Sequence, residues 1–166
     1  MSLITIDGPA GSGKTTLAGI LEDALRRDGA DVFTIHMDDL YDGWENALDG
    51  SLTENLKKLV QEFSESDCLN LPQYNWIKGR FGEPLVVPTP AVLILEGVGS
   101  GQRVTRPMAE IKLWVEVPSS LALQRVLDRD GEGLRDEMQR WQILEAEHFA
   151  LEGTKSAADY RVKSAP

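Results

Sequence analysis

The sequence has almost no cysteine, no long apolar run and few basic residues, and each shortage excludes a class of protein. Its 166 residues include a single cysteine, Cys68, so no intramolecular disulfide can form. A chain without disulfides fits a reducing compartment, and we expect a cytoplasmic protein. The longest aliphatic run, residues 91–95, is far too short to span a bilayer, and no targeting segment is visible. We therefore expect no membrane partner.

Basic residues are outnumbered by acidic ones, 17 against 27, which gives a formal net charge of -10. Binding to nucleic acid depends on neutralisation of phosphates by basic side chains, so this composition argues against a nucleic-acid partner. An anionic nucleotide would have to be held by local basic groups and a metal ion rather than by overall attraction. The length fits one domain, and no repeat or linker divides it.

The most informative feature that the sequence does contain is a glycine-rich motif near the N-terminus. Residues 8–15 read Gly-Pro-Ala-Gly-Ser-Gly-Lys-Thr, which is the P-loop pattern G-x-x-x-x-G-K-[ST]. An apolar run at 3–6 predicts a strand before it, and apolar residues at helical spacing over 17–25 predict a helix after it. Such a backbone directs N–H groups at phosphate oxygens, and the helix N-terminus adds partial positive charge. The residues expected to bind nucleotide phosphates are Gly8, Ala10, Gly11, Ser12, Gly13, Lys14, Thr15 and Thr16.

Acidic residues follow two other predicted strands, residues 32–37 and 91–95. Because ligands bind at the carboxyl ends of strands in an open α/β sheet, Asp38 and Glu96 should face the same edge as the P-loop. Glu96 resembles a Walker B carboxylate, and we expect it to hold Mg²⁺ together with the Thr15 hydroxyl; a helix cap or a surface acid is the alternative. His36 has no histidine or cysteine partner nearby, so we interpret it as a packed or edge residue rather than a metal ligand.

The segment from 69 to 90 carries prolines and aromatic residues, which predict an extended excursion with a turn near Gly82 rather than core. Aromatic side chains in such a segment can close a pocket over a ligand, although they can equally cover an edge of the core. Before it, residues 51–54 match the capping box S-x-x-E and predict the start of an amphipathic helix at Ser51. The candidate substrate-binding residues are Asp38, Tyr41, Tyr74, Trp76 and Arg80.

Arginines separated by glycines lie between the last two predicted helices. Guanidinium groups there would form a small lid over a transferring phosphoryl group, with Arg129 and Arg135 the best placed; a solvated helical face is the alternative. A final helix carries an apolar stripe, and residues 158–162 predict a short last strand. The stripe consists of Leu134, Met138, Trp141, Leu144, His148 and Leu151. Strands and helices alternate throughout, so the fold class is α/β with a parallel sheet.

Taken together, these residues resemble the uridine kinase-like group of P-loop small-molecule kinases, which includes phosphoribulokinases and pantothenate kinases. The resemblance is carried by the P-loop, the run Asp38-Asp39-Leu40-Tyr41, the Pro72-x-Tyr74 segment, the strand end at Glu96 and the arginine lid.

This resemblance implies a P-loop NTPase fold with a five-stranded parallel sheet in order 2-3-1-4-5, covered by helices on both faces. It also implies a single kinase domain over 1–166, with a substrate-covering segment at about 40–90 and a lid at about 128–136. The implied activity is ATP-dependent phosphorylation of a hydroxyl on a small metabolite, with Mg²⁺ as cofactor. The implied catalytic residues are Asp38, Lys14, Arg129 and Arg135. Asp39 stands where the family has serine, so either acid could act.

Two departures bear on the substrate and on the activity. Uridine kinases carry a base-reading histidine shortly after Tyr-Asp-Phe, but residues 74–80 contain none, so uracil or cytosine recognition is not supported. The opening motif also looks like cytidylate kinase, which the short chain and Asp38 fit poorly. The alternative function is a P-loop module that binds a nucleotide without kinase activity; guanine-specific switches carry Asn-Lys-x-Asp, which is absent here. The oligomeric state is left open.

Overall fold

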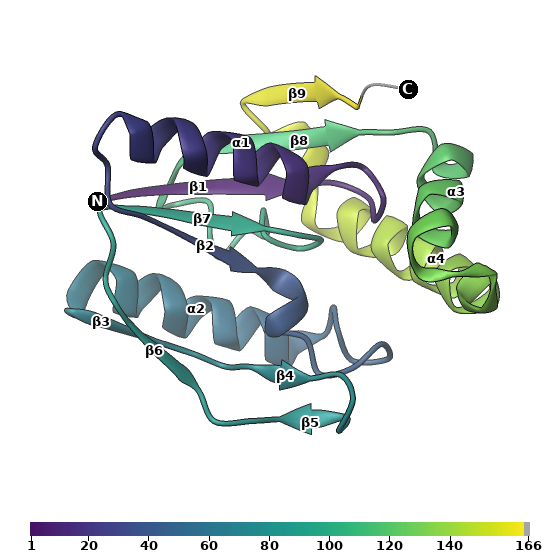
Figure 1. Cartoon of the computed structure of the whole chain (residues 1–166), viewed down its shortest axis with the longest axis horizontal. Helices are drawn as coiled ribbons and strands as arrows, with labels where there is room; N and C mark the ends of the chain where they lie inside the picture. The colour runs from purple at the N-terminus through teal and green to yellow at the C-terminus, as the bar shows by residue number, and fades with distance from the viewer. Residues whose placement is uncertain (165–166) are drawn as a thin grey trace.

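A central sheet of five parallel strands organises the chain, whose computed structural model describes residues 1–164 (Figure 1). Its strands are β1 (Ser2–Asp7), β2 (Val32–His36), β7 (Val92–Glu96), β8 (Ala109–Glu116) and β9 (Tyr160–Lys163). They lie in the order β2-β7-β1-β8-β9, and each neighbouring pair is parallel. Numbered along the chain, that is the order 2-3-1-4-5, which confirms the predicted sheet.

Helices cover both faces of the sheet, because β1 and β7 are apolar on each side. On one face Ile4, Ile6 and Ile94 pack against α1 (Lys14–Arg27). On the other, Leu3, Leu93 and Leu95 join a larger core with α2 (Gly50–Glu65), α3 (Ser119–Asp130) and α4 (Arg135–Glu152). The shorter helices are η1 (Met37–Asp39), η2 (Glu132–Leu134) and α5 (Thr154–Ala157). Among the described residues, no helix is both long and apolar enough to cross a membrane.

The N-cap of α2 lies two residues earlier than the capping box predicts. Asp49 is the N-cap, and its carboxylate accepts a hydrogen bond from the Ser51 N–H at 2.8 Å. The prediction of Ser51 as the cap is therefore wrong. A short aspartate side chain reaches the backbone N–H two residues later as readily as serine does, so Asp49 takes the role first.

The segment after α2 forms an antiparallel hairpin that differs from the prediction in two ways. Its outer strands are β3 (Cys68–Leu71) and β6 (Leu85–Pro88), and its inner strands are β4 (Tyr74–Asn75) and β5 (Arg80–Phe81). The chain reverses at 76–79 rather than near Gly82, because Gly79 takes a positive φ of 62° and its N–H bonds the Asn75 carbonyl. Alternate residues of β3, Leu69 and Leu71, are buried in the larger core, so this segment is not purely peripheral.

The prediction of an apolar stripe on α4 is partly wrong. Met138 and Trp141 are buried as predicted, and His148, expected at the margin of the stripe, is buried too, but Leu144 and Leu151 are exposed. The buried position one turn after Trp141 belongs instead to Glu145. Steps of three and four from Met138 pass through Glu145, and a carboxylate is tolerated there because it accepts a backbone hydrogen bond, as shown below.

If β3 belongs to the core, Leu69→Ala should lower the free energy of unfolding by about 2–5 kcal/mol, because Leu69 is 0% exposed and its loss leaves a cavity. Leu85→Ala on the paired strand is the matched control, and it should cost less than about 1 kcal/mol because Leu85 is 44% exposed. Urea denaturation of both variants measures the difference. Equal costs would place the hairpin outside the core.

Candidate active site

The P-loop lies between β1 and α1 and is held by close packing at two glycines. A Cβ on Gly8 would stand 2.4 Å from the Val115 carbonyl oxygen of β8, and one on Gly11 would stand 2.3 Å from the Ala122 carbonyl oxygen of α3. Both glycines also have positive φ, 146° and 75°. Only glycine fits either position. Gly8 is the first glycine of the motif, whereas Gly11 stands at a position that the motif leaves free and is required here by the contact with α3. The loop residues at 8–13 thus form a backbone cradle ahead of the α1 N-terminus.

Lys14 is buried beneath this cradle, at the first position of α1. Its Nζ donates to the Pro9 carbonyl at 2.8 Å, across the loop. Burial lowers the pKa of Lys14, while the nearby carboxylates of Asp7, Glu96 and Glu145 oppose that shift. The ammonium group therefore lies among acids at the point where the loop curls.

Thr15 and Glu96, the two predicted metal ligands, are in direct contact. The Thr15 hydroxyl donates to Glu96 Oε1 at 3.0 Å, from α1 to the end of β7. His36 Nδ1 lies 2.5 Å from the same oxygen, and this contact raises the pKa of His36. Hydroxyl and carboxylate oxygens are the donors that Mg²⁺ takes in proteins, so this pair fits the ion. The structure places His36 at the edge of the site, where the parallel register of β2 and β7 sets it opposite Glu96.

The acids after β2 differ in their surroundings. Asp38 faces a cavity, and burial followed by the charge of Glu96 raises its pKa. Asp39 is not among the cavity residues; burial raises its pKa too, against the opposing charge of His36. The indole N–H of Trp76 donates to the Asp38 carbonyl at 3.1 Å, which attaches the hairpin to η1.

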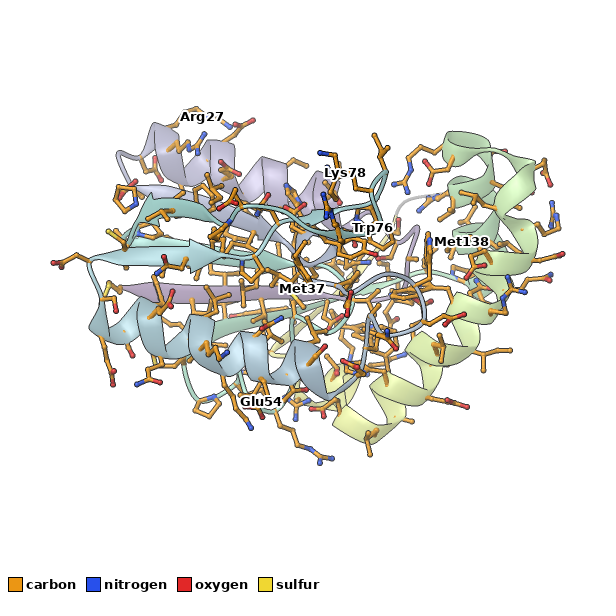
Figure 2. All side chains as sticks on the ribbon, turned by 90° about the horizontal axis from the view of Figure 1, so that it is seen from below. Arg27, Met37, Glu54, Trp76, Lys78 and Met138 are labelled. Carbon is orange, nitrogen blue, oxygen red and sulfur yellow. The ribbon has the colours of Figure 1, made fainter. Side chains whose placement is uncertain are left out.

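This cavity has a volume of about 700 Å³ and brings together most of the predicted site. Figure 2 labels Trp76 of the hairpin and Met138 of α4, and both side chains line the cavity. The residues that line it are Ala10, Gly11, Gly13, Lys14, Thr15, Thr16, Asp38, Tyr41, Trp44, Trp76, Glu96, Gly97, Val98, Arg125, Val126, Arg129, Asp130, Met138 and Trp141. Gly8, Ser12, Tyr74, Arg80 and Arg135 were also predicted for the site and are not among them.

The predicted lid arginines are in different positions. Arg129, near the end of α3, lines the cavity and forms a two-pronged ion pair with Asp130 at 2.8 and 2.6 Å. Arg135 begins α4 and pairs with Glu132 on the surface at 2.7 Å. Arg125, the first arginine of the same series and not one of the two preferred for the lid, lines the cavity and donates to Ser164 Oγ at 2.6 Å. Its position one helical turn before Arg129 was the available signal.

A buried acid that was not predicted from the sequence binds backbone N–H groups at the start of the P-loop. Asp7, the last residue of β1, accepts the N–H groups of Gly8, Gly99 and Gly101 at 2.8, 3.1 and 2.9 Å. Burial nevertheless raises its pKa to about 6. The signal was an acid directly after an apolar strand, where it must find partners.

A second missed acid, Glu145, connects α4 to the same loop. Its Oε2 accepts the Ala10 N–H at 2.9 Å, across 135 positions of the chain. The side chain of Trp141 also forms a hydrogen bond with it, yet burial raises the pKa of Glu145 to about 7. One backbone N–H of the loop is therefore already engaged by the protein.

Glu145 should make stability depend on pH. Its pKa is about 7 in the folded protein and ordinarily 4.5, so between these values the folded chain keeps a proton that the unfolded chain has lost. Stability should fall as pH rises through this window. Glu145→Gln keeps an oxygen for Ala10 but does not titrate. Its free energy of unfolding should therefore rise relative to that of wild type by up to ~3 kcal/mol from pH 4.5 to 7.5, at about 1.4 kcal/mol per pKa unit.

Urea denaturation of both proteins across that pH range measures the difference. Asp7 titrates in both proteins, so only its interaction with Glu145, whose pKa its charge raises, differs between them. Parallel stability curves for the two proteins would show that Glu145 is ionised normally in the fold.

Comparison with known proteins places this geometry among P-loop domains. A family model described as AAA domain matches residues 4–145. The chain is 28% identical over 145 residues to a uridine kinase of Borrelia hermsii, covering 78% of this chain and 68% of that protein.

Two solved structures share the fold. A possible uridine kinase from Bacillus stearothermophilus superposes with a TM-score of 0.72 at 22% identity, over 97% of this chain and 88% of that one. A shikimate kinase from Bacteroides thetaiotaomicron superposes with a TM-score of 0.56 at 16% identity, over 98% and 86%.

Proposed function

The chain belongs to the AAA domain family, and from this premise we propose that it transfers the γ-phosphoryl group of ATP to a hydroxyl of a small metabolite. One observation carries the proposal: the P-loop, the Thr15–Glu96 pair and Asp38 all line the same cavity. A nucleotide-binding module needs only the first two. A carboxylate in the same cavity that can accept the proton of a hydroxyl is what transfer to a second molecule adds, and Asp38 supplies it.

The phosphate half of the site would act through the P-loop and through Thr15 and Glu96, the two predicted metal ligands. Loop N–H groups at 8–13 and the start of α1 would bind the ATP phosphates, and Lys14 would turn from Pro9 toward the β- and γ-phosphates. Thr15 and Glu96 would hold Mg²⁺, which neutralises charge on the phosphates when bound. Since no protein group attacks phosphorus, the chain contributes positioning and electrostatic stabilisation.

Asp38 would orient the accepting hydroxyl and take its proton. The hydroxyl oxygen forms a bond to the γ-phosphorus, the bond from that phosphorus to the β–γ bridging oxygen breaks, and ADP leaves. Phosphoryl transfer has a loose transition state, so the base is needed late and mainly for orientation. Burial raises the pKa of Asp38, which strengthens it as a proton acceptor once it is ionised.

The lid and the hairpin would complete the site. Arg129 lines the cavity and would release Asp130 to meet the developing charge on the transferred group; Arg135 would have to leave Glu132 to do the same. On the acceptor side, Tyr41 and Trp76 are cavity residues. Tyr74 packs edge-to-face against Trp76, with 5.0 Å between ring centroids, and Arg80 is exposed on β5. Contact of Tyr74 or Arg80 with substrate would require the hairpin to move.

The function is tested by ADP release from MgATP with and without a panel of sugars, nucleosides, vitamins and amino alcohols. A kinase shows release that depends on one acceptor, and Lys14→Ala should abolish it because phosphate positioning is lost. ATP binding without acceptor-dependent release across the panel would favour the alternative, a nucleotide-binding module. Unchanged turnover in Lys14→Ala would refute the P-loop assignment.

The two acids after β2 allow a matched test of the base. Asp38→Asn should lower kcat by about 10²–10⁴-fold with nearly unchanged MgATP affinity, because it removes the proton acceptor and keeps the shape. Asp39→Asn should cost much less, since Asp39 lies off the cavity. Steady-state kinetics with the identified acceptor measure both. If Asp39→Asn is the inactivating change, the roles of the two acids are reversed.

A further inference from the structure

Four aromatic side chains line the cavity, Tyr41, Trp44, Trp76 and Trp141, which we call the aromatic wall. They form a continuous series: Tyr41 to Trp141 at 5.7 Å, Trp141 to Trp44 at 5.6 Å and Trp44 to Trp76 at 5.4 Å between ring centroids. Since Trp76 also bonds the Asp38 backbone, the aromatic wall stands directly beside the proposed base. The body of an acceptor held by Asp38 would therefore lie against ring surfaces.

The polar atoms of the aromatic wall are largely used within the protein. The Tyr41 hydroxyl donates to the Val98 carbonyl at 2.7 Å, the Trp76 N–H donates to the Asp38 carbonyl, and Trp141 bonds Glu145. Among the described residues that line the cavity, none is Asn, Gln, Ser or His. The cavity therefore lacks the amide side chains that offer a donor and an acceptor side by side, and outside the P-loop its polar lining consists of charged groups. Apart from these charges, which are considered next, the acceptor body would be recognised by ring contact.

The charges around the cavity disfavour an anionic body. Three cations line it: Lys14 and Arg129 are assigned above to the ATP phosphates and the transferred group, and Arg125 donates to Ser164 Oγ at 2.6 Å. The remaining ionisable groups that line it are the acids Asp38, Glu96 and Asp130, apart from the tyrosine. A phosphate or carboxylate against the aromatic wall would be buried near acids without a counter-ion.

Given the proposed kinase function, on which this inference rests, we propose that the acceptor is an alcohol with an alkylammonium body. Tryptophan is the best ring for binding a cation through its face, and several aromatic rings around one site are the means by which proteins recognise quaternary ammonium groups. The thioether of Met138 adds a polarisable surface beside the rings. The net charge of -10 would draw such a cation toward the protein. Its hydroxyl oxygen bonds the γ-phosphorus, ADP leaves, and the hydroxyl proton passes to Asp38.

The sharpest probe is a pair of alcohols that differ only in charge. Choline and 3,3-dimethylbutan-1-ol have the same shape, with a nitrogen cation in one and a neutral carbon in the other. With wild-type protein and MgATP, choline should give a kcat/KM at least tenfold higher, the scale of a desolvated cation–aromatic contact of about 1.4 kcal/mol. Uridine and glycerol 3-phosphate serve as neutral and anionic comparisons. Binding of each alcohol without ATP is followed by tryptophan fluorescence.

Variants at Trp76 separate ring contact from structure. Trp76 is partly exposed on the hairpin, so its replacement should leave the fold intact. Trp76→Leu should remove most of the preference for choline over its neutral twin, while Trp76→Phe should keep it because a ring face remains. Both variants lose the bond to Asp38 equally. Ile77→Ala is the matched control, since Ile77 is the next residue and is 98% exposed.

The outcomes distinguish the two proposals. Preference for 3,3-dimethylbutan-1-ol, uridine or glycerol 3-phosphate over choline would overturn the inference and leave the kinase function standing. Binding of choline over its neutral twin, without ADP release from any of these alcohols or from the acceptor panel above, would support the aromatic wall as a cation site and overturn the kinase function. Equal loss of the preference in Trp76→Leu and Trp76→Phe would show that Trp76 acts through Asp38 rather than through its ring.

Discussion

The carboxylate of Asp7 holds the centre of the site together. It accepts three backbone N–H groups, one from the first residue of the P-loop and two from the turn that follows β7. Two loops that begin at neighbouring strands are thereby fixed to one buried group, and Glu96 lies where the second loop starts. Because leaving these N–H groups unpaired in the interior would cost about 1–3 kcal/mol each, the positions of the cradle and of the metal pair depend on this one acid.

The site concentrates negative charge where an anion is expected to bind, and the structure shows how this is tolerated. Lys14 lies among Asp7, Glu96 and Glu145, while burial raises the pKa of Asp7 to about 6 and of Glu145 to about 7. Carboxyl groups with raised pKa values carry less charge near neutral pH than their number suggests. Backbone N–H groups and a metal pair can then hold phosphates without a basic surface, which fits a chain with a net charge of -10.

The parts of the fold that sequence predicted are those set by local pattern. The strand, P-loop and helix at 3–25 follow from composition and spacing, and the sheet order followed from the family resemblance that these motifs carry. The missed features depend on contacts between distant segments. Glu145 is buried because Ala10 offers it an N–H, and His36 meets Glu96 through strand register. The hairpin reversal at Gly79 was missed because prolines and Gly82 gave a stronger local turn signal.

The cavity has two halves of different origin, and this division explains what the resemblance to known kinases can and cannot tell. Strand-end loops supply the phosphate half, with Lys14, Thr15 and Glu96, and these are the positions that family motifs describe. The hairpin, the segment after β2 and α4 supply the aromatic half, through Trp76, Trp44 and Trp141. Of these three positions only Trp76 falls in a family motif, at the phenylalanine of Tyr-Asp-Phe, and the base-reading histidine that follows in the family is absent. The phosphoryl-transfer reaction is therefore predicted from the strand-end loops. The choice of acceptor has to be inferred from the surface that the hairpin, the segment after β2 and α4 form together.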